Sequence, residues 1–232
     1  MRAILLAAGM GTRLRPLTLT TPKSLVEING QPMLERQISF LKDIGVNEII
    51  VVVGYLREKF EYLKDKYDVK LIYNEKFNVY NNIYTMYLVR EYLGDSYVID
   101  ADVYLYKNFL DKDISKSTYF SGYKYGFKNE WILEFDDNYN VKDIVIGDGE
   151  GYILSGISYW NKKDASIIVN ELEKVIELDK FFDLYWDHIV KDNLLKLDIQ
   201  IKRIDSYDSF EIDSLSELNS LNKFLYNKQH SI

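Results

Sequence analysis

Two short segments of the sequence hold side chains suited to phosphate and metal chemistry, and the first is rich in glycine and basic residues. It reads Leu6-Ala7-Ala8-Gly9-Met10-Gly11-Thr12-Arg13 and is followed by Thr21-Pro22-Lys23-Ser24. Glycines let backbone N–H groups approach phosphate oxygens closely. Arg13 can bind two such oxygens at once, and Lys23 offers a compact positive charge. Without the basic residues, a Gly-x-Gly after a strand indicates a tight turn as readily as a phosphate site.

This segment matches neither of the two commonest phosphate-binding motifs. No Gly-Lys-Ser/Thr follows the glycines, so it is not a Walker A loop. Leu14 occupies the position of the third glycine in a dinucleotide-binding fingerprint. The segment therefore predicts a phosphate site of another kind.

The second segment is acidic and follows an apolar run. Asp100 and Asp102 are separated by Ala101, and because side chains alternate along a strand, both should face the same side. Mg²⁺ prefers hard oxygen ligands, usually one or two carboxylates together with substrate phosphates. The pair is a candidate magnesium site; the alternative is two turn carboxylates that end the strand.

Aromatic residues mark a third candidate region, in the second half of the chain. Each of the three tryptophans has an acidic or tyrosine neighbour: Glu130-Trp131, Tyr159-Trp160 and Tyr185-Trp186-Asp187. Aromatic faces hold quaternary ammonium groups, which donate no strong hydrogen bonds, whereas primary amines prefer carboxylates and carbonyl oxygens. Tryptophan is also a common core residue, so each of the three could instead be structural.

Acid–base or nucleophilic chemistry has little support. The chain has no cysteine and two histidines, His188 and His230, which have no obvious serine or cysteine nucleophile constellation around them. We expect catalysis by positioning and charge stabilisation.

The elements that position these residues follow from apolar periodicity. Continuous apolar runs predict buried parallel strands that alternate with helices in the first half, and shorter runs around an Asp136-Asp137-Asn138 turn predict a small antiparallel insertion. The expected strands are 3–8, 48–53, 69–73, 97–99, 118–123, 131–135, 141–146, 153–159, 199–204 and 210–212, and the expected helices are 34–44, 56–63, 82–92, 162–178, 184–191 and one from 216, which a Ser214/Glu217 capping box begins.

This order predicts an α/β fold with a mostly parallel central sheet and helices on both faces. Ligands bind beyond the carboxyl ends of the strands in such sheets, where Gly9–Arg13 and Asp100–Asp102 lie. We expect a single domain over 1–232, with a nucleotide-binding half over approximately 1–103 and an acceptor-binding half over 104–232.

Composition excludes several classes of function. The chain has 232 residues, 47% of them hydrophobic, and a net charge of −7. An acidic surface does not suit binding to nucleic acid, and no apolar run approaches the roughly 20 residues of a membrane helix. We expect a cytoplasmic protein without nucleic-acid or membrane partners, and homodimer formation is left open.

The opening motif, Leu-Ala-Ala-Gly-x-Gly-Thr-Arg-Leu-x-Pro-Leu-Thr followed by Thr-Pro-Lys, resembles the signature of nucleotidyltransferases that make activated sugars and activated choline. The later segments Val52–Leu56, Tyr80–Asn82, Tyr97–Asp102 and Asp183–Asp187 resemble the bacterial CTP:phosphocholine cytidylyltransferases. The resemblance runs nearly from end to end and implies transfer of a cytidylyl group from CTP to phosphocholine, with Mg²⁺ as the cofactor.

Carried over by position, the resemblance implies a role for each candidate residue. Arg13 and Lys23 would be catalytic, and Asp102 and Asp213 would bind the metal, although Asp213 could instead cap the last helix. The nucleotide site would comprise Leu6, Ala7, Ala8, Gly9, Gly11, Thr12, Tyr80, Asn81, Asn82 and Asp100. The acceptor site would comprise Trp131, Trp160, Tyr185, Trp186, Asp187 and Glu211.

Two related activities stay open. The acceptor could be phosphoethanolamine or 2-aminoethylphosphonate, which would need the same phosphate loop and carboxylates. A sugar-1-phosphate nucleotidyltransferase shares the opening motif, but this chain is short and lacks a C-terminal repeat domain.

Overall fold

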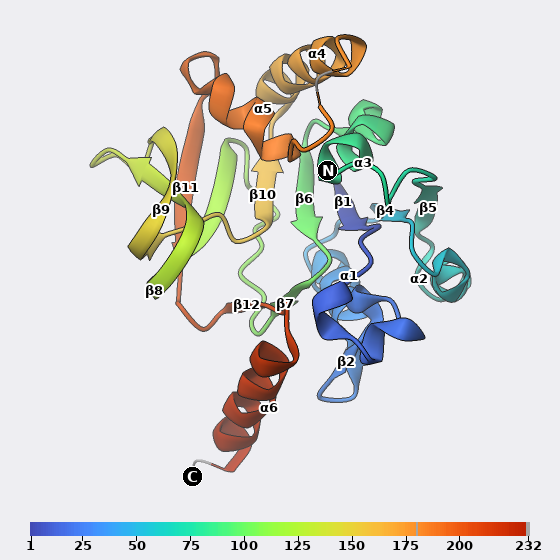
Figure 1. Cartoon of the computed structure of the whole chain (residues 1–232). Helices are drawn as coiled ribbons and strands as arrows, with labels where there is room; N and C mark the ends of the chain where they lie inside the picture. The colour runs from blue at the N-terminus through green and yellow to red at the C-terminus, as the bar shows by residue number, and fades with distance from the viewer. Residues whose placement is uncertain (180, 231–232) are drawn as a thin grey trace.

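The computed structural model describes residues 1–179 and 181–230, and a single twisted sheet runs through it (Figure 1). Its strand order is β11-β8-β10-β6-β1-β4-β5, with β9 paired to β8. Pairing is parallel from β6 through β1 and β4 to β5 and between β8 and β11, and antiparallel where β10 joins β6 and β8. The predicted mostly parallel α/β fold is confirmed. The sheet comprises β1 (Arg2–Ala7), β4 (Glu48–Val53), β5 (Lys70–Tyr73), β6 (Ser96–Asp100), β8 (Ser117–Phe135), β9 (Val141–Tyr152), β10 (Ile157–Trp160) and β11 (Ile199–Ile204).

Helices cover both faces of the sheet because side chains of the central strands are apolar on both sides. In β1, Ala3 and Leu5 belong to the core beneath α1 (Met33–Asp43) and α2 (Tyr62–Tyr67). Ile4 belongs to the opposite core, beneath α3 (Asn82–Leu88), α4 (Lys162–Glu177) and α5 (Trp186–Asp192). Figure 1 shows α3, α4 and α5 together on one side of the sheet and α1 on the other.

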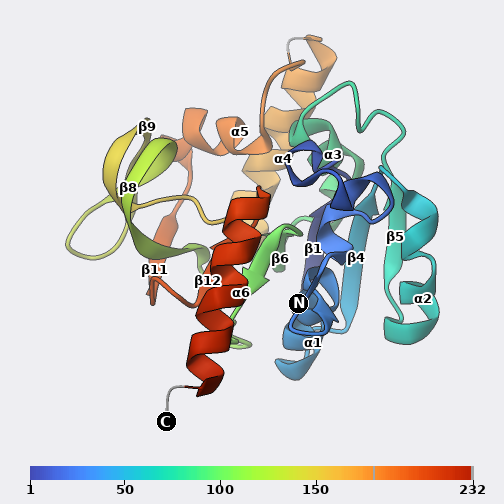
Figure 2. The same cartoon turned by 60° about the horizontal axis from the view of Figure 1, so that its bottom comes forward.

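The last helix, α6 (Leu215–His230), packs against the N-terminal segment of the chain. Leu218 and Leu221 pack in a third core with Leu14 and Val26 from the N-terminal segment. Figure 2 shows α6 lying across the front of the molecule beside β12 (Ser209–Glu211). Strand β12 pairs antiparallel with β7 (Val103–Leu105). The remaining short elements are β2 (Glu27–Ile28), β3 (Gln31–Pro32) and 3₁₀ turns at Thr12–Leu14, Leu17–Leu19, Lys23–Leu25, Arg57–Phe60, Arg90–Tyr92 and Leu194–Lys196. No helix in the described ranges combines the length and the apolar character needed to cross a bilayer.

The capping box predicted for α6 is confirmed. The hydroxyl of Ser214 accepts a hydrogen bond from the backbone N–H of Glu217 at 3.3 Å, and the Glu217 carboxylate accepts the backbone N–H of Ser214 at 2.8 Å. Because Ser214 and Glu217 satisfy this helix end, the side chain of Asp213 is free for another role.

Several predicted elements have different limits in the structure. The expected strands 118–123 and 131–135 form one continuous strand, β8. Strand β9 pairs with it along this length, and register shifts near Phe127 and Glu130 accommodate the polar residues between the two expected strands. The expected strand 153–159 is shorter: β10 begins at Ile157, and Ile153 makes only an isolated bridge to Ile132. The helix expected over 82–92 ends at Leu88 and continues as a 3₁₀ turn.

Gly54 fixes how closely the end of β4 approaches the end of β1. A methyl group at this position would lie 2.6 Å from Cβ of Phe77 and 2.7 Å from the carbonyl oxygen of Ala8. Gly54→Ala should therefore lower the free energy of unfolding by about 1–3 kcal/mol, measured by urea denaturation. Gly147→Ala is the control, because its nearest contact, Ile132 Cδ1, is at an ordinary 3.4 Å; it should change stability by less than about 0.5 kcal/mol. Equal stability of the two variants would contradict the close approach at Gly54.

Candidate active site

A cleft of about 580 Å³ opens beyond the carboxyl ends of β1 and β6. It is lined by most of the residues that the sequence singled out, from both halves of the chain. These are Leu6, Ala7, Ala8, Gly9, Arg13, Lys23, Tyr80, Asn81, Asn82, Asp100, Asp102, Trp131, Tyr185, Trp186, Asp187, Glu211 and Asp213. Gly11 and Thr12 line an adjoining hollow that shares Gly9, Arg13 and Lys23 with the cleft.

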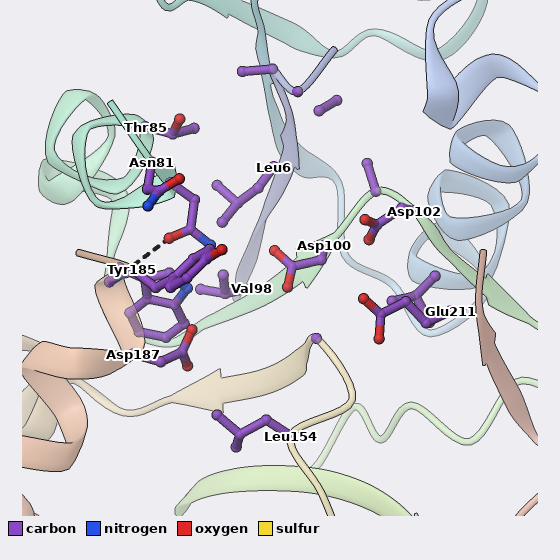
Figure 3. A pocket seen from close by; sticks show the side chains of 18 of the residues that line it. Leu6, Asn81, Thr85, Val98, Asp100, Asp102, Leu154, Tyr185, Asp187 and Glu211 are labelled. Atoms are coloured by element: carbon purple, nitrogen blue, oxygen red, sulfur yellow. Dashed lines mark hydrogen bonds between the residues drawn. The ribbon is translucent and has the colours of Figure 1, made fainter. Parts of the chain in front are cut away.

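The cleft has two chemically different ends. Figure 3 shows Asp102 and Glu211 on one side, and Asn81, Tyr185 and Asp187 on the other. Asp100 lies between the two sides, at the end of β6.

At the first end, Lys23 lies between two carboxylates. Its Nζ is 2.7 Å from Oδ2 of Asp102 and 2.5 Å from Oδ1 of Asp213, and the Lys23 side chain is only 12% exposed. Burial by itself lowers the pKa of Lys23, but the charges and hydrogen bonds of the two aspartates outweigh it and raise that pKa above the usual value. Arg13 contacts the other oxygen of Asp213, at 2.8 Å. The two basic residues and the two acidic ones thus form a single charge cluster.

Gly11 permits the turn that places Lys23 in this cluster. Its φ of +58° is in the left-handed region, and a Cβ there would lie 2.8 Å from Cβ of Lys23. The hydroxyl of Thr18 donates a 2.7 Å hydrogen bond to the carbonyl of Gly11 and holds the turn closed. Gly11 is therefore needed for the shape of the loop.

Three carboxylates of the cluster could share a metal ion. One oxygen each from Asp102, Glu211 and Asp213 lies within 4.8 Å of the others. The Glu211 side chain is accessible from the cleft, but protein surrounds the site, and burial together with the charges of Asp102 and Asp213 raises its pKa to about 8. The pKa of Asp213 is lowered: burial raises it, but the hydrogen bond and charge of Lys23 and the charge of Arg13 prevail.

Asp100 differs electrostatically from its neighbour two residues on. Burial, and then the negative charges of Asp102, Asp187 and Glu211, raise its pKa well above that of a free carboxyl group. Its backbone N–H donates to the carbonyl of Gly156 at 2.8 Å, which fixes the end of β6 against the segment before β10.

At the second end of the cleft, the carboxyl group of Asp187 lies among aromatic rings. Asp187 Oδ1 accepts a 3.1 Å hydrogen bond from the hydroxyl of Tyr119, and burial in the wall of the cleft raises the pKa of Asp187 to about 7. Tyr185 is 46% exposed, whereas Trp186 is 3% exposed and shows the cleft only a small part of its ring. Trp131 packs edge-on against His188, with ring centroids 4.7 Å apart. Trp131, Tyr185 and Asp187 are thus the better exposed members of this wall.

One of the acceptor-site expectations needs correction. Trp160 does not line the cleft: it is fully buried, its Nε1 donates to Ser158 Oγ at 2.8 Å, and its ring supports Trp186 from behind. Glu211 lines the same cleft and also groups with Asp102 and Asp213, because the pairing of β12 with β7 places it beside Val103.

Sequence reasoning missed other lining residues. Tyr119 lies in an apolar strand run and gives no local signal, although its hydroxyl orients Asp187. Glu130 lines the cleft next to Trp131, and burial together with the charges of Asp213 and Glu217 raises its pKa. Its position beside Trp131 was the one signal that could have identified it.

Comparison with known proteins agrees with this geometry. A family model described as nucleotidyl transferase matches residues 2–174. The choline-phosphate cytidylyltransferase of Streptococcus pneumoniae is 49% identical over 98% of this chain and 100% of that protein. The 2-aminoethylphosphonate cytidylyltransferase of Lancefieldella rimae is 34% identical over 93% of this chain and 89% of that protein.

A solved structure gives the same result. The CTP:phosphocholine cytidylyltransferase from Streptococcus pneumoniae superposes with a TM-score of 0.95 at 50% identity, covering 97% of this chain and 98% of that one. Because the match covers nearly the whole chain, it includes the segments that form both ends of the cleft. The chain therefore belongs to the nucleotidyl transferase family.

Proposed function

We propose that this protein is a choline-phosphate cytidylyltransferase, which converts CTP and phosphocholine to CDP-choline and pyrophosphate. The observation that carries the proposal is the two-ended cleft: a basic and acidic cluster around Lys23 faces an aromatic wall that contains Asp187. The identity to the Streptococcus pneumoniae enzyme over nearly the whole chain supports the same activity.

The nucleotide would occupy the first half of the chain. The backbone of Gly9 and Gly11, with the side chain of Arg13, would bind the triphosphate, because free N–H groups and a guanidinium suit phosphate oxygens. The Leu6–Ala8 backbone, Tyr80 and Asn81 line the part of the cleft left for the cytosine and ribose. The acceptor would lie against the second half.

Asp102 and Asp213 would hold a Mg²⁺ ion, with Glu211 nearby. The donor set fits, since all three groups are carboxylates with oxygens within 4.8 Å of one another. The Lys23 ammonium already bridges Asp102 and Asp213, so the two acids are arranged to hold positive charge. When bound, the ion would neutralise phosphate charge near the reacting phosphorus.

The reaction is an in-line displacement at the α-phosphorus of CTP. A phosphate oxygen of phosphocholine forms the new P–O bond, and the bond from the α-phosphorus to the oxygen that bridges to the β-phosphate breaks. Pyrophosphate leaves with that electron pair. Because the attacking phosphate is ionised near neutral pH, no general base is needed, and Lys23 and Arg13 act by stabilising charge and holding the reactants in line.

The acceptor cation would lie at the aromatic wall. A trimethylammonium group has no N–H to donate, and is attracted to ring faces and to a nearby negative charge. Trp131 and Tyr185 offer the accessible rings, and Asp187 offers the charge.

Lys23 should act both as a competitor of the metal and as a catalyst. We expect Lys23→Met to bind Mg²⁺ at least about tenfold more tightly in the absence of nucleotide, because the substitution removes the ammonium group that the two aspartates otherwise bind. Its kcat should fall at least about 100-fold. Titration calorimetry and pyrophosphate release measure the two effects, and Lys59→Met, at an exposed position outside the cleft, is the control. Weaker Mg²⁺ binding by Lys23→Met would contradict the bridging role.

The acceptor is tested by pyrophosphate release with Mg²⁺, CTP and one of four acceptors: phosphocholine, phosphoethanolamine, 2-aminoethylphosphonate or glucose-1-phosphate. We expect a preference for phosphocholine, and a rise of about tenfold in its KM in Trp131→Ala. Tyr125→Ala is the matched control, because Tyr125 is a 75% exposed aromatic on the same strand and outside the cleft. Preference for a primary amine would keep the mechanism and refute the choline site; activity with the sugar phosphate alone would overturn the whole acceptor assignment.

Asp187 should make acceptor binding depend on pH. Because burial raises its pKa to about 7, the carboxyl group is neutral below that pH and attracts a cation only above it. Affinity for phosphocholine should therefore rise as pH increases from about 6 to 8, by up to about tenfold. The phosphate of the ligand titrates too, so the comparison is with Asp187→Asn, which keeps only the dependence due to the ligand. Identical pH profiles for the two proteins would exclude a charge role for Asp187.

A further inference from the structure

The start of α3 is joined directly to the start of α5, across 104 positions of sequence. Oδ1 of Asn82 accepts the backbone N–H of Trp186 at 2.9 Å. The preceding residue makes a second link, as Asn81 Nδ2 donates to the carbonyl of Asp183 at 2.9 Å. Asn82 and Trp186 are the first residues of their helices.

The bond from Asn82 meets a need that α5 cannot satisfy by itself. The first N–H groups of a helix have no acceptor within it. The N–H of Tyr185 is taken by Nδ1 of His188 at 3.0 Å, and the N–H of Trp186 is taken by Asn82. Since that N–H can only donate, the amide atom facing it must be the oxygen, which settles the orientation of the Asn82 side chain.

Aromatic packing strengthens the same junction. The ring of Tyr80 lies 4.7 Å from that of Phe181 and 5.7 Å from that of Phe182, between centroids. On the core side of α5, the Trp186 ring packs edge-on against the Trp160 ring, with centroids 5.6 Å apart. Trp186 is therefore held from the core on one side and by Asn82 on the other.

The junction sets the position of the acceptor wall. Tyr185 and Asp187 are the immediate neighbours of Trp186, and both line the cleft. Figure 3 shows Asn81, Tyr185 and Asp187 on the same side of the cleft. A shift at the start of α5 would move the ring of Tyr185 and the carboxylate of Asp187 together.

We infer that Asn82 is a positioning residue for the acceptor: its amide oxygen fixes the first turn of α5, and with it Tyr185 and Asp187. This role differs from the expectation that placed Asn82 in the nucleotide site, because recognition of the acceptor atoms N3 and O2 of cytosine would use the amide N–H groups. The inference rests on the proposed function for the identity of the acceptor.

Two substitutions at Asn82 separate these roles. Asn82→Ala removes the bond and should raise the KM for phosphocholine about five- to tenfold, with the KM for CTP changed by less than about twofold. Asn82→Asp keeps an oxygen that accepts the N–H of Trp186 and loses the amide donors. It should therefore restore the KM for phosphocholine to within about twofold of wild type. If Asn82→Asp is as impaired as Asn82→Ala and the KM for CTP rises in both, Asn82 acts as a donor to the base and the inference is wrong.

Asn193→Ala is a control for general loosening of α5. Asn193 follows the other end of the helix, where its Nδ2 donates to the carbonyl of Ile189 at 2.9 Å, and it does not line the cleft. This variant should lower the melting temperature without raising the KM for phosphocholine. An equal rise in that KM for Asn193→Ala and Asn82→Ala would overturn the positioning role.

Hydrogen exchange tests the junction independently of any substrate. In the free protein, the amide of Trp186 should exchange at least about fivefold faster in Asn82→Ala than in wild type, and Asn82→Asp should restore protection. Unchanged exchange in Asn82→Ala would overturn the inference. If wild-type protein used none of the four acceptors, the proposed function would fail, and exchange would still decide whether Asn82 holds α5.

Discussion

The ammonium group of Lys23, bound between Asp102 and Asp213, is the interaction on which the site depends. The three residues come from the loop after β1, the turn after β6 and the segment before α6, and Lys23 and Asp213 are 190 positions apart. Two aspartates so close together would repel each other in a partly dry site, so a cation has to accompany them. The packing of α6 on the N-terminal segment holds them in place.

The sheet explains why a phosphate end and an acceptor end share one cleft. Parallel pairing of β1 with β4 and β6 places their carboxyl ends, and the polar loops that follow, along one edge. Antiparallel β10 and the long hairpin of β8 and β9 extend the sheet beyond β6 and bring Trp131 to the same opening. Both ends therefore open into one cleft at the same edge of the sheet.

The acceptor wall has less local support than the phosphate end. Its residues lie in α5, a seven-residue helix that is marginal by itself. Core packing against Trp160 and hydrogen bonds from α3 compensate for this. The same bonds join the first half of the chain to the second, so a change at the start of α3 should shift Tyr185 and Asp187.

Local chemistry determined much of this protein directly. Apolar runs predicted the strands, the Ser214/Glu217 pair predicted the start of α6, and alternation along β6 predicted that Asp100 and Asp102 would reach one cleft. These features depend on residues a few positions apart. Only the tertiary structure decided which distant groups meet: that Trp160 is core, that Glu211 joins the carboxylates, that β8 is one strand and that Asn82 bonds Trp186. Strand pairing and helix packing set those contacts. No local sequence pattern predicts them, because the burial and electrostatic surroundings of a residue depend on which distant segments pack against it.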